Sequence, residues 1–157
     1  LINLRRRTRV LKMAAQLLDR PFGPAGPDLS GTRIGVLGTT FKPNTDDVRD
    51  APALAVTALL HKAGAEVHVY DPQGMENARA VLPEVTYQPT IQDALTDTDL
   101  TCVPTDWGEF RNADPTPLAR VTRRPVVVDG RNCLDPHLWT AAGWEYHGMG
   151  RPGISPS

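Results

Sequence analysis

The residues best suited to chemistry lie in one stretch, GTTFKPNTDDVRDAP, from Gly38 to Pro52. It follows a short apolar run, RIGVL, and precedes a helix-like run, ALAVTALLHKAG. Lys42 is a candidate anion contact because it lies in a loop near a helix N-terminus, where free backbone N–H groups also favour anions. A glycine between a strand and a helix suggests that the anion is a nucleotide phosphate.

The stretch lacks the glycine pattern of a dinucleotide loop. Gly35 and Gly38 are spaced GxxG, whereas a Rossmann dinucleotide loop needs GxGxxG. Asp71, at the end of the next apolar run, resembles the acid that binds a ribose in such folds. However, Pro72 follows it, and because an Asp-Pro pair is a common turn starter we favour a turn there.

The loop also carries three acids, Asp46, Asp47 and Asp50, which are too many for an anion pocket unless they do something else. We expect Asp50 to cap the helix that begins near Pro52, and one of the others to pair with Arg49 and fix the loop. The arginine works against a divalent metal site, so we predict no metal.

A second cation, Arg131, lies in the motif DGRN, directly after the apolar run PVVV. A guanidinium offers a planar fork for phosphate and can stack on a base, so Arg131 could complete a site begun by Lys42. The two cysteines form no disulfide framework. We expect Cys102 to be a small core residue. Cys133 lies near the predicted site and could be a reactive thiol, but we do not favour this interpretation because no histidine lies beside it in sequence.

These residues are positioned by strands that alternate with helices. The pattern predicts an α/β fold with a doubly wound, mostly parallel, Rossmann-like sheet, preceded by an N-terminal helix. The expected helices are 3–20, 52–64, 76–82, 91–95, 107–111, 117–121 and 137–143, and the expected strands are 33–38, 66–72, 85–88, 99–104, 125–130 and, at an edge, 144–150. In such sheets ligands bind beyond the carboxyl ends of the strands. The polar clusters GTTFKPNTDDVRD, TDW and DGRN all follow predicted strands, which predicts that they form one site.

The chain is expected to divide into four segments. Residues 1–20 form a helix, 21–31 a Pro/Gly linker (PFGPAGPDLSG), 32–151 the α/β domain and 152–157 a tail. Because the linker cannot continue a helix, it would allow the first helix to lie outside the core of the domain that follows.

Composition excludes several classes of protein. The 157 residues suit one domain, and a net charge of −1 argues against a nucleic-acid partner bound by bulk electrostatics. No apolar run approaches the ~18 residues of a membrane helix, so we expect no membrane partner and, by default, a cytoplasmic location. The chain begins with Leu1 rather than methionine, which suggests a fragment, a processed product or a trimmed chain.

Five motifs in this order, FKPNTDDVRDAP, VHVYDP, DWGEFR, VVVDGRN and YHGMGR, carry a family resemblance. From about Asn3 to Arg151 the chain resembles the C-terminal UDP-binding domain of the UDP-glucose/GDP-mannose dehydrogenase family, and most closely the bacterial UDP-glucose 6-dehydrogenases. The resemblance implies a full-length enzyme that oxidises UDP-glucose to UDP-glucuronate while two NAD are reduced, through a covalent cysteine intermediate.

Residue by residue, the resemblance implies that Phe41 and Lys42 contact the UDP-sugar and that Arg131 holds its nucleotide part. Arg49 would reach an NAD bound mainly by an N-terminal domain. That domain and the central helix with the catalytic cysteine are not in the sequence, so the resemblance implies half of a substrate site, with no catalytic residue and no activity alone. Its partners would be UDP-glucose or UDP, the N-terminal and central domains, and possible further copies of the enzyme. The alternatives are a dehydrogenase fragment for UDP-N-acetylmannosamine or GDP-mannose, and a free-standing, non-catalytic nucleotide-binding domain.

Overall fold

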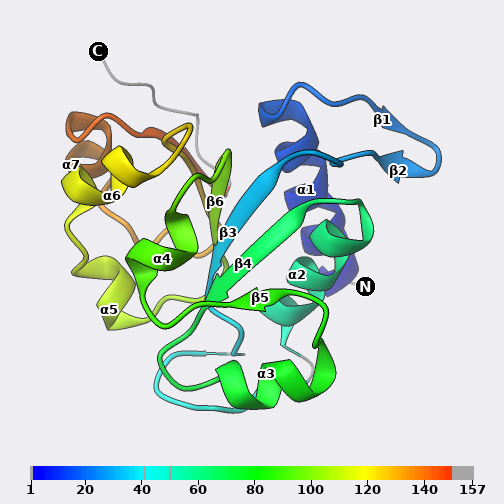
Figure 1. Ribbon diagram of the computed structural model, residues 1–157, viewed down its shortest axis with the longest axis horizontal. Coiled ribbons are helices and arrows are strands. Elements are labelled where there is room, and N and C mark those ends of the chain that lie inside the picture. The colour runs from blue at the N-terminus through cyan, green and yellow to red at the C-terminus, as the bar shows by residue number, and fades with distance from the viewer. Residues whose placement is uncertain (1, 41, 50, 150–157) are drawn as a thin grey trace.

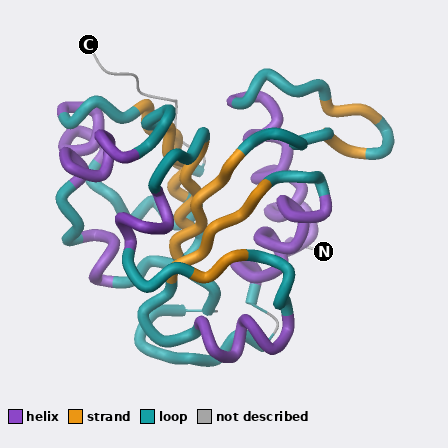
Figure 2. Tube along the Cα trace, viewed as in Figure 1, coloured by secondary structure: helices purple, strands orange, loops and turns teal. Residues whose placement is uncertain are grey.

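The computed structural model describes residues 2–40, 42–49 and 51–149. Its main element is a six-stranded sheet in the order β5-β4-β3-β6-β7-β8, in which every pairing is parallel (Figures 1 and 2). The strands are β3 (Arg33–Leu37), β4 (Glu66–Tyr70), β5 (Thr86–Tyr87), β6 (Leu100–Val103), β7 (Val126–Asp129) and β8 (Glu145–Gly148). The described helices are α1 (Ile2–Leu17), α2 (Pro52–Lys62), α3 (Met75–Val81), α4 (Ile91–Leu95), α5 (Gly108–Arg111), α6 (Pro115–Val121) and α7 (Pro136–Ala141). The predicted doubly wound α/β fold is thereby confirmed.

The chain winds outward from the centre of the sheet in both directions, so β3 and β6 are neighbours at the switch point. Side chains alternate along β3: Ile34 and Val36 face the layer that contains α1 and α2, whereas Leu37 faces the layer of α4 to α7. Helix α3 lies below the sheet in Figure 1, beside the loop that follows β3. Two layers of helices therefore cover the sheet, and its carboxyl edge is formed by loops.

The N-terminal helix belongs to the core. Val10, Ala14, Ala15 and Leu18 are buried in the same cluster as the strand residues, and α1 packs against α2. The suggestion that this helix lies outside the core is therefore wrong for its described side chains. The predicted linker breaks the helix as expected, but it forms a small hairpin, β1 (Phe22–Gly23) and β2 (Gly26–Pro27), and it buries Leu29 completely. Burial of the apolar face of α1 against the sheet therefore holds α1 in place.

The helix before β4 shows how local signals set its bounds. It begins at Pro52, and its chain reverses at Gly64, which has a φ of 105° that favours glycine. The N-cap position is held by Ala51 without a side-chain hydrogen bond, and Asp50 lies outside the described residues. By contrast, Asp114 caps α6 by accepting from the Thr116 N–H, so that this helix begins two residues earlier than predicted.

Candidate functional site

Three polar loops meet at the carboxyl edge of the sheet, after the neighbouring strands β3, β6 and β7 (Figure 1). The Thr105 hydroxyl, after β6, donates to the Thr40 carbonyl, after β3, at 3.0 Å. The Gly130 N–H, after β7, donates to the Val103 carbonyl at the end of β6, also at 3.0 Å. The convergence predicted from the strand pattern is therefore confirmed.

The first loop is anchored where it leaves β3. Gly38 has a φ of 118°, and a Cβ at this position would lie 2.5 Å from the Thr105 side chain, so glycine is required for the close approach of the two loops. The Trp107 indole N–H reaches both the Thr40 hydroxyl, at 3.3 Å, and the Asp71 carboxylate, at 3.1 Å. These hydrogen bonds fix the backbone just before residues 41 and 42 to the loops that follow β6 and β4.

Asp71 is consumed by structural hydrogen bonds. It has no exposed surface, and its two oxygens accept from the N–H groups of Thr39 at 2.8 Å, Gln73 at 2.9 Å and Gly74 at 2.6 Å. The bonds to the second and third following residues are those of a turn begun by an aspartate. The turn interpretation of the Asp-Pro pair is confirmed, and this carboxylate is not available to a ribose.

Lys42 lies on the exposed part of the same loop. Its carbonyl accepts from the Thr40 hydroxyl at 2.9 Å, which ties its backbone to the anchored part of the loop. Among the described residues, the ion pairs do not include its ammonium group. The charge is therefore available to an external anion. Phe41, the other residue predicted to contact the sugar nucleotide, lies outside the described residues.

Farther along the loop, Arg49 pairs with Asp47, as predicted for one of the loop acids. The guanidinium donates through Nε at 3.0 Å and Nη2 at 2.9 Å, and hydrogen bonds from Arg49 lower the pKa of Asp47 to about 2. The Asn77 amide donates to the Asp46 carbonyl at 2.8 Å and so attaches the loop to α3. The Arg49 side chain stays 88% exposed, beside an open groove lined by residues 45–49, Asn77 and Val81.

Arg131 faces the loop that follows β6. Its Nη2 lies 3.8 Å from Oδ1 of Asp106, an oxygen that is buried without a hydrogen bond, and the Arg131 side chain is 42% exposed. The backbone of the Arg131 loop is held by Asp129, whose carboxylate accepts from the N–H groups of Arg131 at 3.3 Å, Cys133 at 3.1 Å and Leu134 at 2.8 Å. A cation is therefore presented on a second braced loop of the same edge.

The thiols do not suit nucleophilic chemistry. Burial and the neighbouring Asp129 raise the pKa of Cys133 to about 12, and burial alone raises that of Cys102 to about 12. Because the thiolate is the nucleophile, burial and the nearby Asp129 carboxylate argue against Cys133 as a reactive thiol. Within the part of the chain that the structure describes, no group of three or more histidine, cysteine or acidic residues could hold a metal ion.

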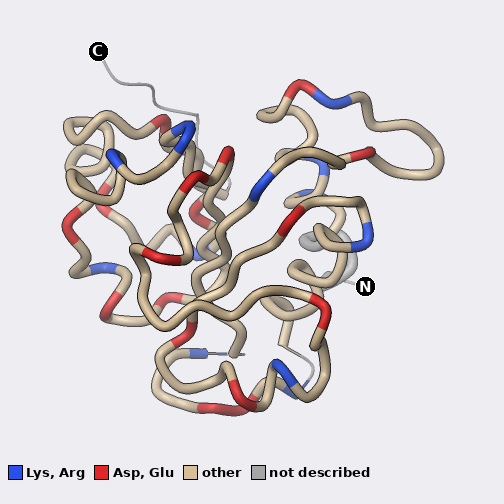
Figure 3. Tube along the Cα trace, in the orientation of Figure 1, with Lys and Arg blue, Asp and Glu red and all other residues tan. Residues whose placement is uncertain are grey.

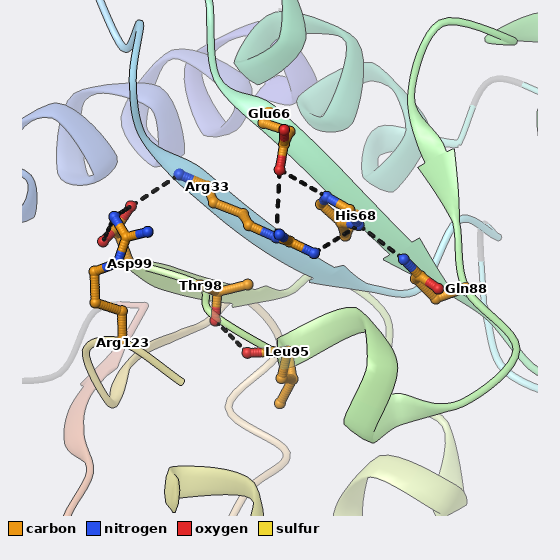
Figure 4. Close-up of polar contacts among 8 residues, drawn as sticks. All are labelled: Arg33, Glu66, His68, Gln88, Leu95, Thr98, Asp99 and Arg123. Carbon is orange, nitrogen blue, oxygen red and sulfur yellow. Dashed lines mark hydrogen bonds and ion pairs between the residues drawn. The ribbon is translucent and has the colours of Figure 1, made fainter. Parts of the chain in front are cut away.

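A second polar cluster lies away from these loops, toward the amino ends of the strands (Figure 4). His68 contacts Glu66 at 3.0 Å and Gln88 at 2.9 Å, and Arg33 reaches Glu66 at 3.4 Å. Asp99 accepts from the Arg33 N–H at 2.9 Å. These groups contact one another across neighbouring strands, so we assign the cluster to the stability of the sheet and not to the candidate site.

Figure 3 shows acidic and basic residues interspersed along the traced chain, in keeping with a net charge of −1. Among the described helices, none combines the length and the apolarity that crossing a bilayer requires.

Sequence reasoning did not identify Asp71 and Asp129 as the residues that hold the candidate loops. Both are acids at the end of a buried strand, followed by a proline or a glycine. That position is shared by ligand-binding acids, so residue type and spacing do not separate the two roles. In the structure, complete burial and hydrogen bonds from several backbone N–H groups indicate that both acids hold the loops and do not bind a ligand.

Comparison with known proteins matches this architecture and these loops to one family. Residues 35–136 match the model of the UDP-glucose/GDP-mannose dehydrogenase family, UDP binding domain. A UDP-glucose 6-dehydrogenase of Rhizobium meliloti is 43% identical over 128 residues, which cover 82% of this chain and 29% of that protein. The UDP-glucose 6-dehydrogenase TuaD of Bacillus subtilis is 38% identical over 144 residues, covering 91% and 31%.

The solved structures agree with the sequence match. A UDP-glucose dehydrogenase from Pyrobaculum islandicum superimposes with a TM-score of 0.72 at 34% identity, over 96% of this chain and 30% of that one. The chain thus spans about 30% of the length of the relatives that it matches. It belongs to the UDP-glucose/GDP-mannose dehydrogenase family and contains that family's UDP binding domain.

Proposed function

We propose that the carboxyl edge of the sheet binds UDP, or the UDP part of UDP-glucose, as the sugar-nucleotide half of a UDP-glucose 6-dehydrogenase. The observation that carries the proposal is the presentation of two cations, Lys42 and Arg131, on separate braced loops after β3 and β7, the strands on either side of β6. Relatives described as UDP-glucose 6-dehydrogenases, at 38% to 43% identity, support the choice of ligand.

The two cations suit different parts of such a ligand. A diphosphate carries more negative charge than one lysine neutralises, so a point charge from Lys42 and backbone N–H groups would act together at the diphosphate. The family resemblance implies that Phe41 also contacts the sugar nucleotide. Arg131 would hold the nucleotide part with its planar guanidinium. Both cations lie on loops whose backbone is anchored by hydrogen bonds, which limits the entropy lost when the ligand binds.

NAD would be held mainly outside this domain. In a dinucleotide fold an acid at the end of the second strand binds the ribose, but here Asp71 is fully buried and committed to the loop. The exposed Arg49 fits a single contact to a phosphate or base of the dinucleotide. NAD supplies hydride acceptance when it is bound, and this chain would orient the sugar nucleotide and help to exclude water from it.

The proposal includes the predicted division of the chain, with 32–151 as the UDP-sugar domain and 1–20 as a helix from the segment between domains, which packs against that domain's core. Because burial raises the pKa of both thiols and the chain spans about 30% of the length of its relatives, we expect no oxidation by the chain alone. With UDP-glucose and NAD, the purified chain should produce no absorbance of reduced NAD.

Calorimetric titration of the 157-residue chain with UDP, with GDP as the control, tests the proposal. We expect saturable binding of UDP and at least about tenfold weaker binding of GDP, since base-edge hydrogen bonds discriminate strongly between ligands. Equal affinities would refute the choice of UDP. Absence of binding by both nucleotides would refute the claim that this domain holds the nucleotide site by itself.

A further inference from the structure

Two fully buried carboxylates lie beneath the proposed site. Asp71 directly follows β4 and Asp129 ends β7, and neither has exposed surface. A buried carboxylate is costly unless hydrogen bonds satisfy its charge. The groups that donate these hydrogen bonds are therefore fixed in place by them.

Asp71 joins three segments of the edge. It accepts from the Thr39 N–H in the loop after β3, from the Gln73 and Gly74 N–H groups in its own turn, and from the Trp107 indole after β6. A Cβ on Gly74 would lie 2.6 Å from both the Thr39 and Thr40 side chains, so this turn also packs directly against the first loop. The start of the segment that carries Lys42 is therefore fixed to β4 through one carboxylate.

Asp129 does the same for the other cation. It accepts from the Arg131, Cys133 and Leu134 N–H groups, and its Oδ2 also accepts from the Tyr146 hydroxyl of β8 at 2.7 Å. The loop that carries Arg131 is therefore wrapped around a single carboxylate, which is itself fixed to the next strand.

We propose that Asp71 and Asp129 are positioning residues for nucleotide binding: each uses its charge to hold the backbone from which Lys42 or Arg131 reaches the ligand. This inference rests on the proposed function. Only a carboxylate can accept all of these hydrogen bonds. An amide of the same shape would place its NH₂ group against a backbone or indole N–H, so that two donors would face each other. Loss of the charge would release the loop and displace its cation.

Asp99 provides a matched control. It is 6% exposed and accepts from the Arg33 N–H at 2.9 Å and from Arg123 at 3.3 Å (Figure 4). It precedes β6 and so lies at the amino edge of the same sheet, opposite the proposed site. Its loss should destabilise the fold without moving either binding loop.

The test compares Asp71→Asn, Asp129→Asn and Asp99→Asn in the whole chain, by thermal unfolding and by calorimetric titration with UDP. We expect all three variants to lower Tm, but only Asp71→Asn and Asp129→Asn to weaken UDP binding, by about tenfold. The inference is overturned if those two bind UDP as the wild type does, or if Asp99→Asn weakens binding equally.

Two milder variants serve if an asparagine variant does not fold. Trp107→Phe and Tyr146→Phe each remove one donor and leave the carboxylate in place. We expect each to weaken UDP binding a few-fold, and an unchanged Kd in both would contradict the inference.

Amide hydrogen exchange separates this inference from the proposed function, because it needs no ligand. In Asp71→Asn, exchange should accelerate in the loop after β3 but not at Arg131; in Asp129→Asn the pattern should reverse. If the wild type binds no UDP but the two variants show this exchange pattern, the claim that this domain holds the nucleotide site by itself is refuted, while the role of each aspartate in holding its loop is supported. Unchanged exchange in both variants would refute the positioning roles whether or not UDP binds.

Discussion

Replacement of Lys42 by alanine is the most direct test of the site, because it changes binding with little effect on the fold. The side chain is exposed, and its ammonium takes no part in the ion pairs of the described residues. The loop is held by other groups, chiefly Asp71 and Thr105. A surface substitution of this kind changes the free energy of unfolding by less than about 0.5 kcal/mol.

The expected loss of affinity follows from the surroundings of the ammonium group. A charge-assisted hydrogen bond contributes about 1.5–3 kcal/mol, and each 1.4 kcal/mol is a factor of about ten in Kd. Because Lys42 is exposed and its field is screened by solvent, the lower end of that range applies. We therefore expect Lys42→Ala to weaken UDP binding about tenfold, and to reduce the dependence of Kd on salt concentration.

The assay is calorimetric titration with UDP at two salt concentrations, with Lys62→Ala as the control. Lys62 is also an exposed lysine, but it ends α2, at the opposite edge of the sheet. Its removal should leave Kd unchanged. If Lys42→Ala binds UDP as tightly as the wild type, with the same salt dependence, the assignment of Lys42 to the diphosphate is refuted.

Two further predictions concern the first loop. The Arg49 guanidinium lowers the pKa of Asp47 from 3.8 to about 2, so the ion pair is complete above about pH 4 and is lost as the pH falls through about 2. Arg49→Ala should return the pKa of Asp47 toward 3.8, followed by NMR of the carboxyl carbon, and an unchanged pKa would contradict the pairing. Gly38→Ala should lower the free energy of unfolding by at least about 1 kcal/mol, because of its positive φ and the contact with Thr105. Gly23→Ala, which meets open space at an ordinary φ, is the control, and equal stability of the two variants in urea would contradict the strain argument.

The fold was predictable where local patterns are strong. The apolar runs ending at Tyr70 and Asp129 each become one buried strand, and Pro52 and Gly64 mark the ends of the helix between strands as expected. The packing of the N-terminal helix was not predictable, because a Pro/Gly segment shows that a helix stops but not what covers its apolar face. That outcome depends on Leu29 and the side chains of α1 meeting the sheet layer, which is a tertiary contact.

The site was predictable to the level of its loops. Parallel strands place their carboxyl ends at one edge, so the placement of the Lys42 and Arg131 loops at the same edge follows from parallel pairing. The order that puts β6 between β3 and β7 came from the structure. The roles of the acids do not follow, because an exposed ligand, a salt-bridge partner and a buried anchor use the same residue type. Only the partners observed for Asp47 and Asp71 distinguish these possibilities.

These partners explain how a loop edge rich in acids can attract an anion. Asp47 is paired with Arg49, while the charges of Asp71 and Asp129 are directed into backbone N–H groups beneath the surface. The ammonium of Lys42 and the partly exposed guanidinium of Arg131 reach solvent on these loops, although Asp46 is also exposed and Asp106 lies beside Arg131. Because the buried acids hold the loops that carry the two cations, removing the charge of a buried aspartate should weaken anion binding although it makes the domain less negative. Simple charge counting predicts the opposite direction, and the Asp71→Asn titration decides between the two.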